Sequence, residues 1–222
     1  VDLAATSATS YAITTGALPT GLSMSTSTGD ITGTLNADPA TYNFTVTATD
    51  AEAQSSPRLF NIIVNALPTG GTIIESAAYT GNTHRSHTFF TAGNGSSTNN
   101  FVIGSTTVVD YLIIAGGGSG GYGGGGAGGM YTATSVSLSA GTYAAVVGAG
   151  APATGSTNTF GNFGSNSTFN SITAVGGGAG GSGTTTTGGG GGSGGGGGAF
   201  AGGTNFPGGA GTPGQGNGGG VG

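Results

Sequence analysis

A glycine-rich turn at residues 118–123, with the sequence GSGGYG, follows an apolar stretch and has the G-x-G-x-x-G spacing of a dinucleotide-binding loop. That chemistry requires a helix that opens behind the glycines, so that its N–H groups hold a pyrophosphate, and an acidic residue about 20 positions later for the ribose. The residues that follow are GGGAGGMYTATS, in which each Gly costs about 1 kcal/mol of helix stability relative to Ala. The last acidic residue, Asp110, precedes the glycines. The sequence therefore argues against a nucleotide site.

Catalytic chemistry has few side chains available to it. A Ser or Thr nucleophile requires an adjacent base, and beyond Asp110 the chain has no carboxylate, His or Lys. There is no Cys. We therefore expect no catalytic residues, no enzymatic activity and no cofactor.

Metal binding is equally poorly supported. His84 and His87 are three residues apart, a spacing that places them on opposite faces of a strand, and two ligands do not complete a site. Calcium takes about six to eight oxygen ligands, so acidic side chains hold it only where their loops converge. We expect no metal site, and the sequence leaves calcium open at Asp30, Asp38, Asp50 and Glu52.

The composition excludes several classes of partner. Of the 222 residues, 54 are Gly, charged residues make up 4 %, and the formal net charge is −5, which disfavours nucleic acid and anionic membranes. The longest apolar run, VVDYLIIA, is far shorter than the roughly 20 residues that cross a bilayer, so we expect no membrane insertion. The chain begins with Val1, and we expect it to be part of a longer protein.

Residues 1–66 have the pattern of short β-strands. Tyr42, Phe44, Val46 and Ala48 fall on one face at period two, and Gly or Pro separates the strand-like segments, which predicts an immunoglobulin-like β-sandwich. The stretch YAITTGALPTGLSMSTSTGDITGTLNADPATYNFTVTATD resembles the immunoglobulin-like, cadherin-like domains repeated in bacterial and phage surface proteins. The resemblance covers residues 11–64 and implies a spacer module. The sequence lacks the strand that usually precedes the Tyr, so we expect a domain that is cut at its N-terminus or that borrows a strand from elsewhere.

Residues 67–175 again have the pattern of strands, and we expect a β-rich scaffold with a Gly insertion at 116–129. Two strand-like runs within 130–147 meet at LSAGT, where Gly can supply the positive φ of a tight loop. This pattern predicts a β-hairpin.

Residues 176–222 contain 27 Gly in 47 positions and no charged side chain. Hydrophobic collapse cannot order such a segment, since ordering costs roughly 1–2 kcal/mol per residue. Two hypotheses remain: a flexible tether, or polyglycine II helices that have three residues per turn and bond sideways to one another. The insertion at 116–129 is held by strands at both ends, which favours the second. At about 3.1 Å per residue the segment 188–198 would form a rod of roughly 34 Å, with chain reversals at 184–187, 199–207 and 211–217.

The same region resembles the glycine-rich domain of bacteriophage tail-fibre proteins. The blocks VDYLIIAGGGSGGYGGGGAGG, GTYAAVVGAGA and GSNSTFNSITAVGGGAGG follow one another in the order found in that family, over residues 84–181. The resemblance implies an all-β fold in which stacked polyglycine II helices carry loops that contact the host receptor. It also implies a virion or extracellular location and no α-helix.

We therefore expect a structural and adhesive component of an extracellular fibre, and the favoured interpretation is a phage tail or virion fibre. A bacterial secreted surface adhesin or filament subunit and an ice-binding polyglycine II protein are the alternatives. The expected partners are a host-surface glycan or protein and other fibre subunits, with a homotrimer as one form. The receptor-contact residues we expect are Thr184, Thr185, Thr186, Thr187, Phe200, Asn205 and Phe206.

Overall fold

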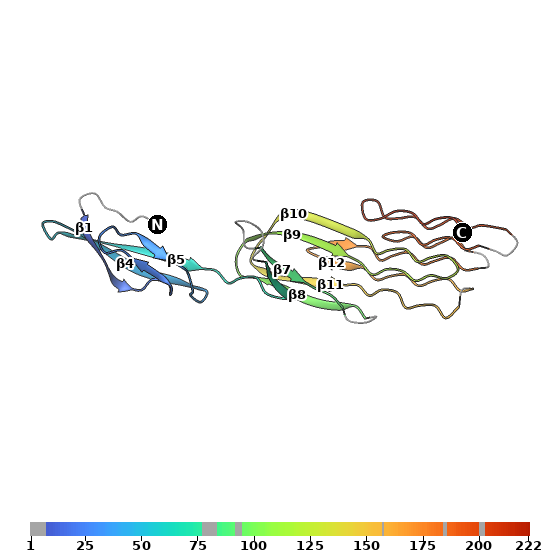
Figure 1. Cartoon of the computed structure of the whole chain (residues 1–222), viewed down its shortest axis with the longest axis horizontal. Coiled ribbons are helices and arrows are strands. Elements are labelled where there is room, and N and C mark those ends of the chain that lie inside the picture. The colour runs from blue at the N-terminus through green and yellow to red at the C-terminus, as the bar shows by residue number, and fades with distance from the viewer. Residues whose placement is uncertain (1–7, 77–83, 92–94, 157, 184–185, 200–202) are drawn as a thin grey trace. The chain divides into compact units, whose positions relative to one another are not determined.

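The computed structural model describes residues 8–76, 84–91, 95–156, 158–183, 186–199 and 203–222. The chain divides into two compact units, Val1–Leu67 and Pro68–Gly222. The described part contains strands and no helix, so the fold is all-β (Figure 1).

The first unit is a small sandwich. Its larger sheet has the order β1-β4-β5, formed by Ala8–Gly16, Ala40–Asp50 and Ser55–Val64, and all its pairs are antiparallel. The smaller sheet pairs β2, Leu22–Met24, with β3, Ile31–Gly33.

The core of the first unit contains Tyr11, Phe44 and Val46, against which Met24 and Ile31 of the small sheet pack. Phe44 and Val46 are 2 % and 4 % exposed, while Asn43, the residue before Phe44 in the same strand, is exposed to solvent. The period-two prediction for this strand is confirmed.

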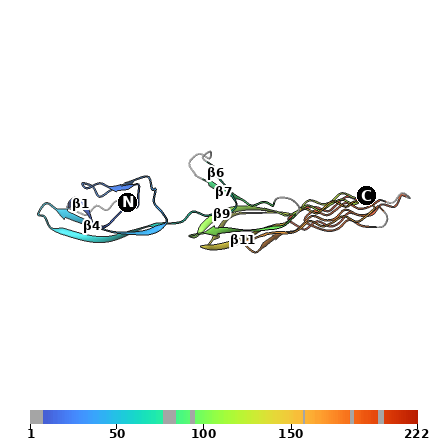
Figure 2. The same cartoon turned by 90° about the horizontal axis from the view of Figure 1, so that it is seen from below.

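The second unit begins with a sandwich of different topology. The larger sheet has the order β13-β12-β11-β8, and the smaller pairs β10 with β9. A further hairpin, β6 with β7, lies beside these sheets in Figure 2. The strands are β6 (Thr72–Ser76), β7 (His84–Thr88), β8 (Ser97–Ile103), β9 (Thr107–Ile114), β10 (Met130–Leu138), β11 (Gly141–Val147), β12 (Ser167–Phe169) and β13 (Ile172–Ala174).

The predicted hairpin at 130–147 is wrong. Both of its strands exist, but β10 pairs with β9 and β11 pairs with β8, so the tight connection is a corner between two sheets. The reason is the core: Leu138 at the end of β10 is 3 % exposed and clusters with Phe101 and Ile103 of β8. Facing sheets bury these side chains together, which a two-stranded hairpin would not do.

Aromatic rings connect the two sheets of this sandwich. Phe169 lies at 5.2 Å from Tyr111 of β9 and at 6.1 Å from Phe101 of β8, measured between ring centroids. The ring of His87 packs edge-on against Phe101 at 4.9 Å, and its Nδ1 lies 2.8 Å from the carbonyl oxygen of Gly70. This places His87 in a packing role in β7.

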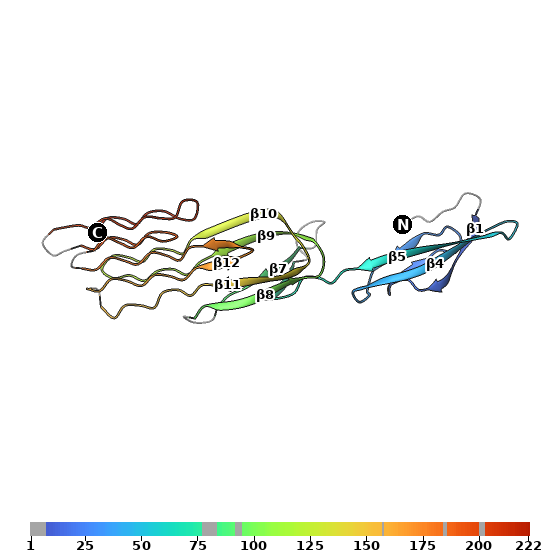
Figure 3. The same ribbon diagram turned by 180° about the vertical axis from the view of Figure 1, so that it is seen from behind.

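Extended glycine-rich segments, called rods here, follow the strands of the second unit. They lie side by side, as Figures 1 and 3 show. We define them as R1 (115–120), R2 (123–129), R3 (148–154), R4 (160–166), R5 (175–182), R6 (186–191), R7 (193–198), R8 (206–211) and R9 (216–222).

Hydrogen bonds between the rods recur every three residues, as expected for polyglycine II. R5 is the central rod and bonds to R1, R2, R4, R6 and R7 at N···O distances of 2.7 to 3.0 Å. Gly177 and Gly180 donate to R1, for example, while Gly178 and Gly181 donate to R7. Consecutive residues therefore point to different neighbours, and the main chain replaces a hydrophobic core.

Steric contact, and not φ, makes glycine necessary inside the bundle. A Cβ on Gly118 would meet the carbonyl oxygen of Gly178, and one on Gly180 would meet that of Gly123, although neither residue has a left-handed φ. On outer positions such as Gly124 and Gly220 a Cβ would have open space around it. The same residue type thus has different roles within one rod bundle.

The segment 188–198 does not form the single rod of roughly 34 Å that we expected. It folds back near Gly192, so that the N–H of Gly195 donates to the carbonyl oxygen of Gly189 at 2.8 Å. R6 and R7 are consequently antiparallel neighbours. Two short rods each gain lateral partners along their whole length, which one long rod outside the bundle would not.

Candidate functional site

The loops that connect the rods at the end of the bundle away from the strands form the candidate site. R1, R3 and R5 run away from β9, β11 and β13, and R7 runs in the same direction because its bonds with R5 advance in parallel register. Their connections to the returning rods therefore gather at one end of the bundle, which we call the tip. The tip contains the described residues of the segments 120–123, 154–160, 182–187 and 199–206.

The tip of the bundle has no charged side chain. Residues 111–222 contain no Asp, Glu, Lys, Arg or His. Hydroxyl groups, side-chain amides, aromatic rings and backbone groups are therefore the recognition elements in this region. Such a surface suits an uncharged or weakly polar partner more than an ion.

The predicted contact residues have different roles. Thr186 is structural: its Oγ1 accepts the N–H of Ser182 at 2.7 Å, and its carbonyl oxygen accepts the N–H of Gly198 at 3.1 Å. Thr187 and Asn205 are exposed and available for contact, whereas Phe206 is half-buried. The predicted residues Thr184, Thr185 and Phe200 lie outside the described residues.

Three aromatic residues in this region were missed by the sequence analysis. Tyr122 is 58 % exposed in the turn between R1 and R2, and Phe160 and Phe163 are 37 % and 55 % exposed on R4. The rings of Phe160 and Phe163 lie 5.9 Å apart between centroids. A spacing of three residues returns to the same face of a polyglycine II helix, so this spacing was the signal that could have found the pair.

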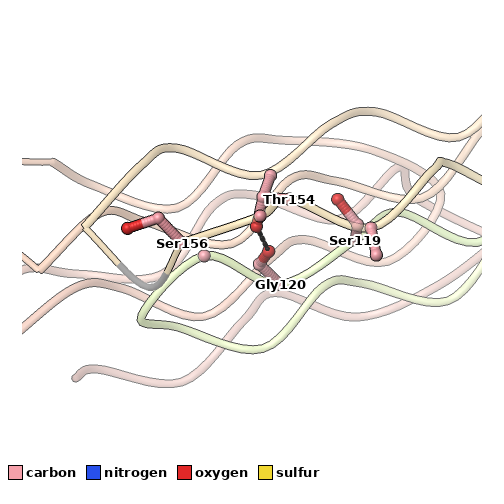
Figure 4. A pocket seen from close by; sticks show the side chains of 7 residues that line it. Ser119, Gly120, Thr154 and Ser156 are labelled. Atoms are coloured by element: carbon pink, nitrogen blue, oxygen red, sulfur yellow. Dashed lines mark hydrogen bonds between the residues drawn. The ribbon is translucent and has the colours of Figure 1, made fainter.

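A shallow cavity of about 300 Å³ opens at the tip between two connections (Figure 4). One wall is the turn 119–121 and the other is the loop 153–156. The hydroxyl group of Thr154 donates to the carbonyl oxygen of Gly120 at 2.8 Å and joins the two walls.

The opposite end of the bundle is stabilised by side-chain bonds. Gln215, in the turn between R8 and R9, accepts the N–H of Val175 at 2.8 Å and donates to the carbonyl oxygen of Thr173 at 2.9 Å. The last two rods are thereby fixed to the end of β13. This bonding leaves the tip as the end where loops are free to differ.

Two acidic side chains of the first unit, Asp50 and Asp30, stabilise turns. Asp50 Oδ1 accepts the N–H groups of Glu52 and Gln54 at 3.1 and 2.8 Å, and Asp30 accepts the hydroxyl of Thr28 at 2.7 Å. Among the described residues no group of three or more His, Cys, Asp or Glu is placed to hold a metal ion. The part of the chain that the structure describes also contains no helix long and apolar enough to cross a membrane.

Comparison with protein families matches both units. Residues 1–65 are similar to the family described as "Putative Ig domain", and residues 91–222 match the family described as "Glycine-rich domain". Neither the curated proteins nor the solved structures that were compared gave a match. The second match spans more than half of the chain and includes the rods and the tip. The chain therefore belongs to the glycine-rich domain family.

Proposed function

We propose that this protein is a structural and adhesive component of an extracellular fibre, in the first place a phage tail or virion fibre, and that its tip attaches to a host surface. An immunoglobulin-like module followed by a glycine-rich domain is consistent with a surface or fibre protein. The resemblance of the glycine blocks to tail-fibre proteins supports the phage origin. A bacterial surface adhesin is the alternative, and genes for capsid or secretion proteins beside this one would separate the two.

The observation that carries the proposal is that main-chain hydrogen bonds between the rods, and not the loops at their ends, hold the bundle together. R5 by itself makes such bonds with five rods, namely R1, R2, R4, R6 and R7. The loops at the tip are therefore not needed to fill a core, and their side chains are free for contact. A scaffold that holds several loops rigidly at one end is the usual basis of a recognition surface.

Thr187, Asn205 and Phe206 are the contact residues we propose among those described. Thr187 and Asn205 offer exposed hydroxyl and amide groups, and Phe206 adds a half-buried ring. Tyr122, which is 58 % exposed, extends the same surface. Aromatic rings and hydrogen-bonding groups held in fixed positions are typical of contact surfaces for proteins and glycans.

Contact with other subunits, as in a homotrimer, belongs to the same proposal. The outer face of β9 supports it, because Val108, Leu112 and Ile114 are 66 %, 56 % and 56 % exposed and Met130 beside them is 53 % exposed. Exposed apolar groups that lie together on a strand pair are typical of protein contacts. Light scattering of the full chain measures the number of subunits in the assembly directly.

The test of attachment uses the fluorescently labelled full chain on cells of a panel of bacteria. We expect saturable binding to some strains, and the double variant Thr187→Ala/Asn205→Ala should weaken it without lowering the melting temperature. A matched control is Thr142→Ala, an exposed substitution in β11 far from the tip. Equal binding by both variants would remove these residues from the contact, and no binding to any strain would oppose the adhesive role.

The ice-binding alternative has its own measurement. An ice-binding face needs a regular flat row of small residues, and a thermal-hysteresis assay of the full chain detects its activity. We expect no thermal hysteresis, because aromatic rings such as Phe160 and Phe163 project from R4.

A further inference from the structure

The cavity at the tip has the size of a small ligand site. Its volume of about 300 Å³ lies at the lower end of the range of ligand sites, about 300 to 1,000 Å³. It is lined by Ser119, Gly120, Gly121, Ala153, Thr154, Gly155 and Ser156 (Figure 4). Loops about 30 residues apart in the sequence form it, so it exists because R1 and R3 lie side by side.

The hydroxyl groups of the cavity have unused hydrogen-bonding capacity of both kinds. Ser119 Oγ accepts the N–H of Asn162 at 2.8 Å, and Ser156 Oγ accepts that of Asn158 at 3.2 Å, which leaves each O–H to donate. Thr154 donates its proton to Gly120, which leaves its oxygen lone pairs to accept. In Figure 4 the hydroxyls of Ser119, Thr154 and Ser156 are spread along the cavity.

The surroundings select against charged ligands. No charged or titratable acid or base occurs at positions 112–222, apart from tyrosine hydroxyls. A phosphate, a carboxylate or an ammonium group would lose part of its water on binding without gaining an opposite charge, which is unfavourable. Methyl and methylene surface from Ala153, Gly120 and Gly155 adds apolar contact to the hydroxyls.

The walls are held in place before any ligand arrives. The N–H of Ala151 donates to the carbonyl oxygen of Gly117 at 2.8 Å, and the N–H of Gly121 donates to that of Gly123 at 3.0 Å. Asn162 Nδ2 also donates to the carbonyl oxygen of Pro152 at 3.0 Å. A preformed site avoids the free-energy cost of ordering its loops on binding.

We infer that this cavity binds one ring of a neutral saccharide. Neighbouring hydroxyls of a sugar both donate and accept, which matches Ser119 and Ser156 as donors and Thr154 as acceptor. The inference rests on the proposed attachment function and names the receptor chemistry as an uncharged glycan.

The test is an NMR titration of the ¹⁵N-labelled full chain with glucose, galactose and N-acetylglucosamine. Sialic acid and glucose 6-phosphate are the charged comparisons. We expect saturable shifts at the amides of Gly120, Thr154 and Gly155 for at least one neutral sugar, with a Kd of about 1 to 10 mM, as for a weak single-ring ligand. No such shifts for any neutral sugar, or stronger shifts with the charged sugars, would overturn the inference.

A matched pair of glycine variants tests the location of the site. Gly155 and Gly124 are exposed and a Cβ on either would meet no other atom within 4 Å, so a larger side chain has room toward solvent and both Gly155→Phe and Gly124→Phe should fold. Only Gly155 lines the cavity. We expect Gly155→Phe to weaken sugar binding at least about tenfold and Gly124→Phe to leave it unchanged; equal affinities would show that the cavity is not the site.

Cell attachment separates this inference from the proposed function. If the chain attaches to cells and no neutral sugar shifts its amides, the saccharide site is wrong and the attachment stands. If neutral sugars bind at the cavity and no cells are bound, the saccharide site stands and the adhesive role is wrong.

Discussion

The substitution Gly178→Ala tests whether main-chain bonding holds the rod bundle together. Gly178 lies in R5, and a Cβ there would meet the carbonyl oxygen of Gly189 and, at 2.6 Å, the backbone nitrogen of Gly195. Its φ is outside the left-handed region, so Ala is acceptable to the local backbone and the clash is the main effect. R6 and R7 must therefore move away from R5.

The magnitude follows from the bonds that this movement breaks. Gly178 donates to the carbonyl oxygen of Ser193 in R7 at 2.9 Å, and the carbonyl oxygen of the next residue, Ala179, accepts the N–H of Gly189 in R6 at 2.7 Å. Each bond contributes about 1 kcal/mol net, and a buried group left without a partner costs about 1 to 3 kcal/mol. We expect a loss of about 3 to 6 kcal/mol, which lowers the melting temperature of a unit of this size by roughly 10 °C or more.

Scanning calorimetry of the full chain measures the effect, and Gly124→Ala is the control because its Cβ would have open space. Ala there should be neutral or slightly stabilising, by about 0.4 to 1 kcal/mol, since it restricts the unfolded chain. Hydrogen exchange should also show slow amides at Gly177 and Gly180, which donate within the bundle. Equal melting temperatures for the two variants, or fast exchange at these amides, would refute the reasoning.

Three further substitutions test other elements by denaturant unfolding. Asp110→Ala should cost about 1 kcal/mol, because Asp110 Oδ1 accepts the N–H of Ser135 at 2.7 Å in a bulge of β10, and Asp110→Asn should cost less. A loss equal in both variants would contradict this role. Gln215→Ala should cost about 1 to 3 kcal/mol through its two bonds to the end of β13; an unchanged midpoint would mean that the last rods do not depend on it. Gly29→Ala should destabilise the first unit alone by about 1 to 2 kcal/mol, because its φ is +77° and its Cβ would lie 3.3 Å from the Tyr11 ring. A shift in the second unit's transition would speak against that.

Much of the strand content could be predicted from local sequence. Period-two alternation identified the strand that contains Phe44 and Val46, and both are buried in the first core. Such patterns succeed because a strand with one buried face repeats its apolar residues every two positions. The high Gly content and the lack of charge also indicated rods that bond sideways, and the hydrogen bonds of R5 have the expected three-residue interval.

Partner choice could not be predicted in the same way. The strands around LSAGT looked like a hairpin, but β10 and β11 pair with β9 and β8. The return of the chain near Gly192 was missed for a similar reason, since a turn made of glycine carries no side-chain signal. Pairing depends on contacts distant in sequence, which local propensity does not record.

The sequence by itself determined the kind of stabilisation in this protein: alternating apolar residues in the sandwiches, and glycine in place of a core in the rods. Tertiary structure decided which glycines are enclosed, such as Gly178, and which are open, such as Gly124. It also decided that the loops 119–121 and 153–156 meet at one cavity. The physical reason is that glycines are identical in sequence, and only the position of each rod among its neighbours fixes what surrounds each one.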